Sequence, residues 1–330
     1  MLIDSFGRAI DYLRISLTDR CNLRCAYCMP REGLQWLPHA ESLSSDEILR
    51  VVRAAARLGI SKIRLTGGEP LVHPEIIPIA CEIAATPGVS DLSLTTNATL
   101  LEKLAEPLAR AGLKRVNISL DTLDADKFRR ITRFGDFSRV WNGILAAEAA
   151  GLTPLKLNTV VVNGFNADEL LPLARLSIEH PWHMRFIELM PIGNTADWGE
   201  GFPSEPERYL SVQAMRAQLL TFNLQPVTMP LGNGPARAFR IPGALGTVGF
   251  ISPLGEHFCE TCNRLRLTAD GKLRACLFKT GELDLRSALR EGQPLEPYIQ
   301  ESVRRKPAGH ELWLKDMTVE SQRGMSQIGG

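Results

Sequence analysis

Two groups of three cysteines are the side chains of this sequence with the clearest capacity for chemistry. The first group consists of Cys21, Cys25 and Cys28, spaced as C-x3-C-x2-C. Four thiolates would complete a structural zinc site, so a zinc knuckle at this position lacks one ligand. Three thiolates on a cubane iron–sulfur cluster instead leave one iron free to bind a substrate or cofactor. The spacing therefore favours a cluster with one open iron.

The second group lies near the end of the chain and consists of Cys259, Cys262 and Cys276, spaced as C-x2-C-x13-C. Zinc remains an alternative here because His257 offers a fourth ligand. A second cluster with one open iron agrees better with the presence of the first group. The remaining cysteine, Cys81, is predicted to be a buried hydrophobic residue of an apolar helix. The other histidines show no ligand spacing: His39, His73, His180, His183 and His310.

Cys262 and Cys276 are joined by a segment that predicts a β-hairpin with an Asp-Gly pair at its tip. A two-residue turn would mix polar and apolar residues on each face. A three-residue loop over 269–271, with its glycine left-handed, pairs Leu267 with Leu273 and keeps the apolar residues on one face. We therefore predict the three-residue loop.

This register places three arginines on the same face as the third cysteine of the group. Arg264 lies opposite Cys276, and Arg266 lies opposite Arg274. Like charges directly opposite each other are unfavourable unless an anion lies beside them. A polyphosphate ligand or a carboxylate would supply that anion, and a solvated face with splayed arginines is the alternative.

The composition of the 330-residue chain excludes several classes of protein. Hydrophobic residues make up 44%, enough for a sizeable core, which excludes a mainly disordered chain. Lys and Arg number 38 against 37 Asp and Glu, which excludes binding of polyanions through the overall field. No apolar run is long enough to span a bilayer and no signal peptide is recognised, so we expect a cytoplasmic protein with reduced cysteines.

The elements that must position the cysteine groups alternate between short β-like segments and helical segments. The six expected strands cover Tyr12–Leu17, Lys62–Leu65, Asp91–Thr95, Arg115–Leu120, Leu155–Val162 and Met184–Leu189. Six strand–helix units predict an α/β fold with a parallel sheet, either barrel-like or doubly wound. Two further units would be needed for a complete eight-stranded barrel.

Signals at the helix ends support these units. The helix expected over Ser44–Leu58 begins with a capping box formed by Ser44 and Glu47. The helix expected over Ala167–His180 has Asn166 as its predicted N-cap. Glycines typical of helix C-termini follow four helices, at Gly59, Gly88, Gly112 and Gly151.

The first cysteine group, with an aromatic residue before its last cysteine, resembles the signature of radical S-adenosylmethionine (SAM) enzymes. The next expected strand ends in a segment similar to the glycine-rich motif of that superfamily, whose backbone contacts the methionyl amino group of SAM. This segment consists of Gly67, Gly68, Glu69 and Pro70. Both motifs follow carboxyl ends of strands, where barrels and open α/β sheets place their sites.

The segment GEHFCETCNRLRLTADGKLRACL, together with both cysteine groups, resembles the GTP 3′,8-cyclase family of molybdenum cofactor biosynthesis over essentially the whole chain. That family carries a C-terminal Gly-Gly tail that reaches the active site, matched here by Gly329 and Gly330. The resemblance implies that a first [4Fe-4S] cluster cleaves SAM to a 5′-deoxyadenosyl radical, which takes a hydrogen atom from C3′ of GTP. The carbon radical attacks C8 of a guanine held by the second [4Fe-4S] cluster, and reduction of the resulting radical gives (8S)-3′,8-cyclo-7,8-dihydro-GTP.

The resemblance also implies roles for single residues. Contacts to SAM are implied for Tyr27, Gly67, Gly68, Glu69, Pro70, Ser119 and Met190. Contacts to GTP are implied for Arg14, Arg64, Thr95, Lys156, Arg264, Leu265 and Arg266. Catalytic roles are implied for Arg185, Arg264, Arg266, Gly329 and Gly330. An ion pair between Arg185 and Glu188 is the plainer alternative for Arg185.

We therefore expect a partial (βα)6 barrel similar to a TIM barrel over residues 1–225. Its open side is covered by a C-terminal iron–sulfur and GTP-binding domain over 226–330. The expected partners are GTP, an electron donor and the cyclic pyranopterin monophosphate synthase that receives the product; no nucleic acid or membrane is expected, and a homodimer is left open. Ala98 stands where the family has a glycine, which costs about 1 kcal/mol if the position takes a positive φ.

Three other functions remain alternatives at the level of sequence. A radical SAM enzyme that matures peptides also carries an auxiliary cluster, but Arg264 and Arg266 beside the second cysteine group suit a nucleoside triphosphate. A two-cluster electron carrier normally ligates every iron by cysteine. A zinc-hairpin protein that binds nucleic acid disagrees with the formal net charge of +1 and the missing fourth ligands.

Overall fold

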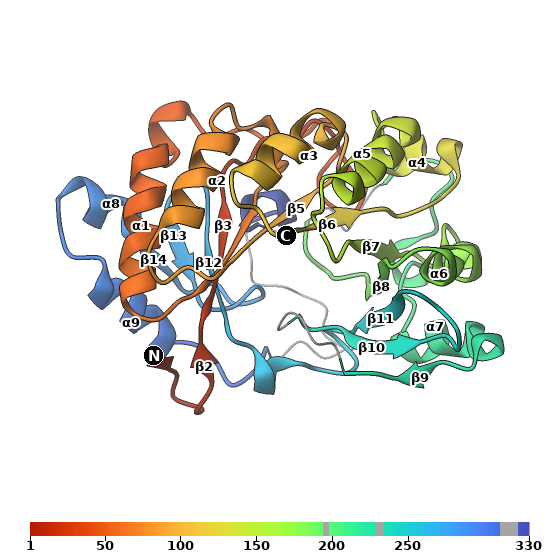
Figure 1. The fold of residues 1–330 in the computed structure, drawn as a ribbon. Helices are drawn as coiled ribbons and strands as arrows, with labels where there is room; N and C mark the ends of the chain where they lie inside the picture. Colours follow the sequence, from red (N-terminus) through yellow and green to blue (C-terminus); the bar gives the residue numbers. More distant parts are fainter. Residues whose placement is uncertain (194–197, 229–233, 311–322, 330) are drawn as a thin grey trace.

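The computed structural model describes residues 1–193, 198–228, 234–310 and 323–329. One sheet of twelve strands runs through this part of the chain, in the order β14-β13-β12-β3-β4-β5-β6-β7-β8-β11-β10-β9. The strands from β12 to β11 are parallel to their neighbours, and those at both outer ends are antiparallel. The sheet curves into an incomplete barrel with helices along its outer side (Figure 1).

The six predicted strands are all present, and their ends differ from the prediction by one residue. They are β3 (Tyr12–Ser16), β4 (Lys62–Thr66), β5 (Asp91–Thr96), β6 (Arg115–Ser119), β7 (Lys156–Val161) and β8 (His183–Glu188). The helices between and after them are α1 (Ser45–Arg57), α2 (Ile76–Ala85), α3 (Leu101–Arg110), α4 (Ala125–Thr132), α5 (Phe137–Ala149) and α6 (Leu170–Glu179). The strand–helix alternation that the sequence predicted is therefore confirmed.

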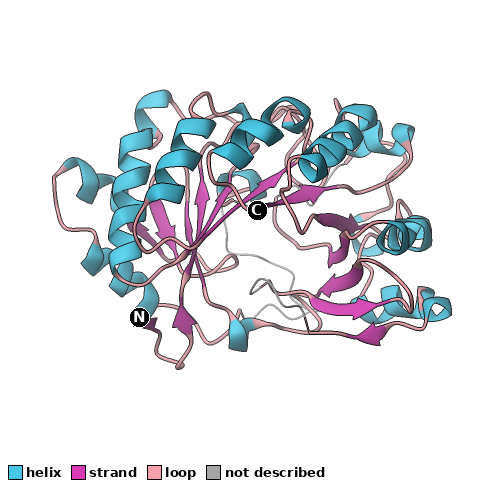
Figure 2. Cartoon of the chain, in the orientation of Figure 1, coloured by secondary structure: helices cyan, strands magenta, loops and turns pink. Residues whose placement is uncertain are grey.

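The C-terminal third extends the same sheet at both edges. Strand β11 (Thr247–Ile251) pairs in parallel with β8, and β12 (Arg264–Leu267) pairs in parallel with β3. With β11 and β12, the number of parallel strands reaches the eight of a complete barrel, two more than the six predicted strand–helix units supply. The barrel still does not close, because β11 and β12 do not pair with each other. On its outer side β11 pairs with β10, and β12 pairs with β13, so the sheet has two free ends (Figure 2). The boundary near residue 225 stays a prediction.

Shorter elements complete the described chain. The remaining strands are β1 (Leu2–Ile3), β2 (Ala9–Ile10), β9 (Gln225–Pro226), β10 (Arg237–Arg240), β13 (Lys272–Arg274) and β14 (Glu282–Asp284). The remaining helices are α7 (Val212–Gln218), α8 (Leu285–Arg290) and α9 (Glu296–Arg304), with a 3-10 turn, η7, over Met325–Gln327. None of the helices in the described ranges is both long and apolar enough to cross a bilayer.

The two faces of the parallel strands differ in polarity. In β3, Leu13 and Ile15 are fully buried in the main apolar core. The alternate residues Tyr12 and Arg14 instead line a cavity inside the barrel. A parallel sheet that only packs against other elements is apolar on both faces. The polar inner face is therefore built to meet a polar ligand.

Two local predictions were wrong. Asn166 stands at the N-cap position of the 3-10 turn over Ala167–Glu169, but its side chain makes no capping bond: the amide accepts the N–H of Val162 (2.7 Å) and donates to the carbonyls of Asp121 (2.7 Å) and Val160 (2.9 Å). It ties the end of β6 to the end of β7. Cys81 is exposed, because α2 buries the face that carries its isoleucines and leaves the cysteine on the opposite side.

The predicted helix ends are otherwise confirmed. Ser44 caps α1 with the expected capping box, in which Glu47 reaches back to the Ser44 N–H (2.8 Å). The four glycines that follow helices all have positive φ, between 72° and 95°. These local signals set where each helix stops and the chain turns toward the next strand.

Candidate active site

A cavity of about 310 Å³ opens at the carboxyl ends of the parallel strands. All six cysteines of the two groups line it: Cys21, Cys25, Cys28, Cys259, Cys262 and Cys276. Residues from opposite ends of the chain meet here because β12 pairs with β3, the strand that precedes the first group. The pairing of these two strands thus places both cysteine groups around one space.

The first cysteine group lies on the loop that follows β3. The N–H of Ala26 donates to the carbonyl of Ile131 (2.8 Å), which fastens this loop to α4. Burial raises the pKa of Cys21 to about 12 and that of Cys28 to about 11. Burial also raises the pKa of Cys25, and the nearby Asp121, Cys28 and Cys21 add to the shift. Three thiols that resist ionisation without a counter-charge suit a cationic iron centre, which binds them as thiolates.

Gly67 and Gly68 let this cysteine loop pack directly on the end of β4. A Cβ at Gly67 would lie 2.4 Å from the carbonyl oxygen of Thr18, and one at Gly68 would lie 2.3 Å from that of Arg20. The N–H of Gly68 donates to the Thr18 carbonyl (2.7 Å). Any side chain at either position would push the loop away, so the glycine pair sets the position of the first cysteine group.

The Glu69 carboxylate fastens the next strand to the same loop. It accepts the hydroxyl of Thr96 (2.7 Å) and the N–H groups of Asn97 (2.7 Å) and Leu71 (3.0 Å). Burial outweighs these three donors and raises the pKa of Glu69 to about 7. Asn97 in turn donates to the side chain of Asn22 between the first two cysteines (2.9 Å).

Ala98 stands where the resembled family has a glycine, and it takes the left-handed conformation expected for that glycine, with φ of 61°. Its N–H donates to the Thr96 hydroxyl (3.0 Å). Its carbonyl lies against Gly143 of α5, where a Cβ would come within 2.4 Å of the Ala98 oxygen. The strain at Ala98 is therefore held in place by the close approach of α5.

Tyr27 forms a buried pair with Asp121, a residue that the sequence analysis missed. The Tyr27 hydroxyl donates to Oδ2 of Asp121 (2.8 Å), and the N–H of Val160 donates to Oδ1 (2.9 Å). Burial raises the pKa of Asp121 to about 6 against these bonds. Ser119 and Met190 line the same part of the cavity. A carboxylate directly beyond the end of β6 was the available signal for Asp121.

The second cysteine group is carried by the predicted hairpin. Arg266 pairs with Arg274 and Leu267 pairs with Leu273, while Gly271 has φ of 77°, so the three-residue loop is confirmed. The anion beside Arg274 is a carboxylate, that of Glu282 on β14. The polyphosphate alternative thus does not apply to Arg274.

Two cations lie beside Cys262 of the second group. Although burial disfavours its charged form, the adjacent Arg264 and Lys306 lower its pKa to about 6. Lys306 also donates to the carbonyls of Arg264 (2.8 Å) and Ala275 (2.7 Å) and so clamps the two strands of the hairpin together. The sequence analysis missed Lys306, which lies far along the chain after α9.

The cavity wall carries a cluster of buried and half-buried cations. Arg14, Arg64, Arg185, Arg264 and Arg266 all line the cavity. Burial first and neighbouring arginines second lower the pKa of Arg185 to about 9 and that of Arg266 to about 10. No ion pair joins Arg64, Arg185 or Arg266 to a described carboxylate. The ion pair between Arg185 and Glu188 is absent because Glu188 accepts instead from the hydroxyls of Tyr209 (3.1 Å) and Ser252 (2.8 Å).

Four of the residues with implied roles do not line the cavity: Pro70, Lys156, Leu265 and Gly329. Lys156 lies buried at the amino end of β7, where burial, Arg185, Arg115 and Arg64 lower its pKa to about 6. Leu265 faces the apolar core. Gly330 lies outside the described residues.

Among the residues that the structure describes, several buried polar atoms of the cavity wall have no hydrogen-bond partner. They are the hydroxyls of Tyr12 and Thr95 and the amide oxygens of Asn117 and Asn158. A buried polar atom without a partner costs about 1–3 kcal/mol. Four such atoms on one wall indicate a polar ligand that supplies the missing bonds.

The C-terminal tail, residues 323–329, contacts both cysteine groups, through Ser326 at Cys28 and Ile328 beside Cys276. Met325 and Ser326 line the cavity. Ile328 is fully buried and packs with Ile192 and Phe278 in a small cluster that also contacts Cys276. Arg266 donates to the carbonyl of Gly329 (2.6 Å). The tail is thus held at one end by an arginine of the cavity wall.

Arg323 holds the other end of the tail to the hairpin. Its guanidinium donates to both carboxylate oxygens of Asp270 (3.1 and 2.8 Å) and to Glu282 (2.9 Å). The sequence analysis missed this contact because Arg323 and Asp270 lie far apart in the chain and carry no motif. The pair connects the tip of the hairpin to the tail.

Two family models match this chain in succession. One describes the radical SAM superfamily and matches residues 15–177. The other is described as molybdenum cofactor synthesis C and matches residues 182–312. Together they cover both cysteine groups and the strands from β4 to β14.

Several full-length relatives carry one name. A protein of Moorella thermoacetica named GTP 3′,8-cyclase is 50% identical over 331 residues, covering 99% of each chain. Proteins of the same name from Pelotomaculum thermopropionicum and Listeria monocytogenes are 49% and 46% identical, covering 99–100% of this chain and 99% of their own. Among solved structures, Streptococcus suis SuiB bound to S-adenosylmethionine aligns with a TM-score of 0.61 at 15% identity, over 88% of this chain and 68% of SuiB. That likeness shows the fold.

Proposed function

The chain belongs to the GTP 3′,8-cyclase family of the radical SAM superfamily, and from this premise we propose that its barrel cavity converts GTP to (8S)-3′,8-cyclo-7,8-dihydro-GTP. The relatives that share this name match the chain over its full length. The reaction is the first step of molybdenum cofactor biosynthesis, consistent with the second family model. The cavity combines what this reaction needs: thiols for iron, cations for a triphosphate and an enclosed wall.

The cations carry the proposal. Arg64, Arg185 and Arg266 are desolvated in one wall without a described carboxylate partner, which is unfavourable until an anion enters. A triphosphate offers several charged oxygens at the spacing that guanidinium groups bind well. The hydroxyl of Thr95 and the amides of Asn117 and Asn158 offer hydrogen bonds to the ribose or to the base. GTP therefore satisfies both the charge and the unpartnered polar atoms.

The first cysteine group fits a [4Fe-4S] cluster with SAM, as membership of the superfamily implies. When bound, that pair supplies the one-electron chemistry that removes a hydrogen atom from the substrate. Tyr27, held by Asp121, and the backbone of the glycine pair form the wall against which SAM lies. Ser119 and Met190 extend the same wall.

The second cysteine group fits a second [4Fe-4S] cluster that binds the guanine. Only three cysteines face this side of the cavity in the described chain, so one iron is left open for a ligand. Arg264 and Lys306 favour the thiolate form of Cys262 and so favour its binding of iron. The guanine is thereby held near the second group while the triphosphate lies against the arginines.

The protein residues position the ribose, neutralise the triphosphate and shield the substrate from water. Arg185 lies within β8 and lines the cavity together with the other arginines, and we place the reacting ribose beside it. Arg266 joins the triphosphate site to the carbonyl of Gly329, so the tail closes over the substrate and excludes water. The electron donor, the synthase that accepts the product and a homodimer belong to the same proposal.

Iron content and GTP binding test the two roles separately. Replacing the three cysteines of either group with serine should leave about half the iron of the wild type after anaerobic reconstitution. The variant of the second group should lose most GTP binding by calorimetry, whereas the variant of the first group should keep it. Wild-type GTP affinity in the second-group variant would contradict the role given to that cluster.

A further inference from the structure

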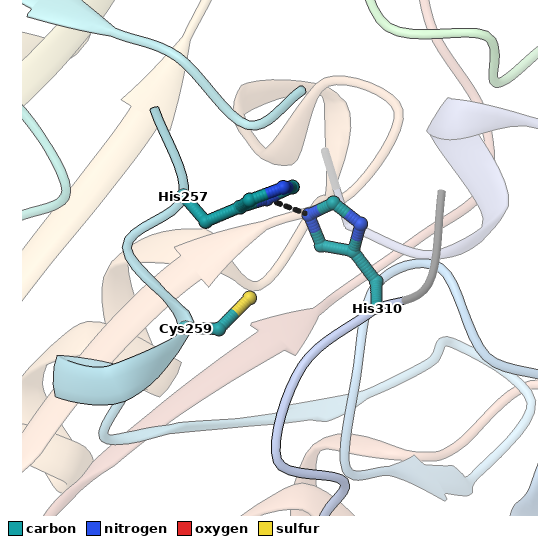
Figure 3. Close-up of side chains that lie close together, drawn as sticks. All are labelled: His257, Cys259 and His310. Atoms are coloured by element: carbon teal, nitrogen blue, oxygen red, sulfur yellow. Dashed lines mark hydrogen bonds between the residues drawn. The ribbon is translucent and has the colours of Figure 1, made fainter. Parts of the chain in front are cut away.

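His257, Cys259 and His310 form a compact set of metal-binding side chains at the rim of the cavity. Figure 3 shows the two imidazoles and the thiol converging from two separate segments. The ligand atoms all lie within 4.8 Å of one another. Nδ1 of His257 and Nε2 of His310 are 3.2 Å apart. His310 is buried, and the other two residues are half-buried.

The separation of the two ring nitrogens matches a single ion, which would replace the contact of Nδ1 of His257 with the carbonyl of Pro253 (3.1 Å). Zinc binds nitrogen at about 2.0–2.1 Å in tetrahedral geometry, which holds two nitrogens about 3.3 Å apart. A cubane cluster has its irons at separate corners and spreads its ligands more widely than one ion does. Two imidazoles and one thiolate also form a mixed nitrogen and sulfur ligand set, which binds zinc in preference to hard cations such as magnesium or calcium. The fourth position is left for water.

Arg8 holds this set in place without taking part in it. Its guanidinium donates to the carbonyls of Cys259 (2.7 Å), Ala308 (3.0 Å) and Pro307 (2.6 Å). Asp4 pairs with the same guanidinium (2.6 Å) and keeps it oriented. The two segments that carry the ligands are therefore tied together by protein groups, so the site is organised before any metal enters.

We propose that His257, Cys259 and His310 bind one zinc ion when the second cluster is absent. Cys259 belongs to both sets, so zinc and the second cluster exclude each other at this thiol. Zinc bound here therefore holds the protein in a form that cannot assemble its second cluster. The mutual exclusion of zinc and the second cluster rests on the proposed function, because that function assigns Cys259 to the cluster. The zinc site itself is independent of the proposed function.

A zinc titration of the full-length, cluster-free protein tests the site. With a chromophoric chelator as competitor, the wild type should bind one zinc ion tightly. His257→Ala and His310→Ala should each weaken binding at least about 100-fold, and Arg8→Ala about 10-fold through lost organisation. His39→Ala, an exposed histidine away from the set, and Cys276→Ala serve as matched controls that should bind as the wild type does. Loss of zinc in Cys276→Ala with wild-type binding in His310→Ala would overturn the proposal.

A spectrum of the wild type keeps the proposal testable even where a variant fails to fold. Cobalt in place of zinc should show charge-transfer absorption of one thiolate per metal, whereas intensity typical of three thiolates would place the ion among the cysteines and contradict us. Wild-type protein loaded with zinc should take up only the iron of the first cluster, and His310→Ala should regain the full amount. Full iron uptake by zinc-loaded wild type, with zinc still bound, would refute the exclusion and the assignment of Cys259 to the cluster, but not the zinc site.

Discussion

Replacing Arg323 with alanine should release the C-terminal tail while the barrel stays intact. Arg323 is the residue that fastens the start of the tail to the hairpin, through two bonds to Asp270 and one to Glu282. The end of the tail is held separately, by Arg266 at Gly329 and by the buried side chain of Ile328. The variant therefore removes one of several anchors of the tail and changes no cavity-lining side chain.

The size of the effect follows from the exposure of these groups. A hydrogen bond to a charged group contributes about 1.5–3 kcal/mol when it is buried. The Arg323 side chain is 22% exposed and that of Asp270 is 11% exposed, so solvent screens part of this contribution. We take about 2 kcal/mol for the whole contact, which lowers the ratio of docked to released tail about 30-fold.

Hydrogen exchange followed by mass spectrometry measures this ratio. The amides of Gln327 and Ile328 donate to carbonyls within η7 and should exchange about 30-fold faster in Arg323→Ala. Peptides from β4, β5 and β6 should exchange as in the wild type. Arg290→Ala is the matched control, because Arg290 also pairs with a carboxylate, Glu47, but lies away from the tail.

Catalytic activity should depend on whether the tail is docked. GTP-dependent product formation should fall in Arg323→Ala, while GTP affinity changes little, since the arginines of the cavity wall remain. Arg323→Lys should not restore the wild-type rate, because lysine lacks the planar fork that binds both oxygens of Asp270. Unchanged exchange in η7 together with full activity would refute the argument that Arg323 docks the tail.

Three further predictions test other parts of the account. Arg266→Ala should weaken GTP binding about 10- to 100-fold by calorimetry and leave SAM cleavage without GTP turnover; unchanged affinity would rule out a phosphate clamp. The pKa of Lys156 is about 6 in the free protein, lowered by burial and by the charges of Arg185, Arg115 and Arg64. A triphosphate that neutralises the cavity-lining Arg185 and Arg64 should raise this pKa, so that binding takes up a proton and weakens as pH rises from about 7 to 9. Calorimetry in buffers of different ionisation enthalpy should detect this uptake in the wild type and not in Lys156→Met; equal uptake would contradict it. Gly143→Ala should lower the free energy of unfolding by about 1–3 kcal/mol, since its methyl group would meet the Ala98 carbonyl, and an unchanged denaturation midpoint would show that α5 has room to move.

The parallel strands and the hairpin could be predicted from the sequence because their signals are local. Alternating apolar residues define β3 to β8, and in the hairpin the requirement that the apolar residues share one face fixes the register of Arg266 against Arg274. The cysteine groups could be recognised for the same reason, since ligands within one loop have a readable spacing. Their meeting in one cavity depends on the pairing of β12 with β3, which no local pattern encodes.

The parts that could not be predicted depend on contacts between distant segments. Arg323 meets Asp270, and His310 meets His257 and Cys259, only once the sheet has brought their segments together. Cys81 was assigned to the core because its neighbours are apolar, yet the period of α2 places it on the exposed side. Lys156 was expected to face the ligand, but its place at the amino end of β7 puts it below the cavity wall.

The measurement that tests the central claim most directly is an anaerobic product analysis. The protein is reconstituted with iron and sulfide, reduced with dithionite and supplied with SAM and GTP, and the products are separated by mass spectrometry. We predict 5′-deoxyadenosine together with an isomer of GTP that has unchanged mass. 5′-Deoxyadenosine without conversion of GTP would contradict the assignment of the cavity to GTP, and no cleavage of SAM by a protein with both clusters loaded would contradict the account as a whole.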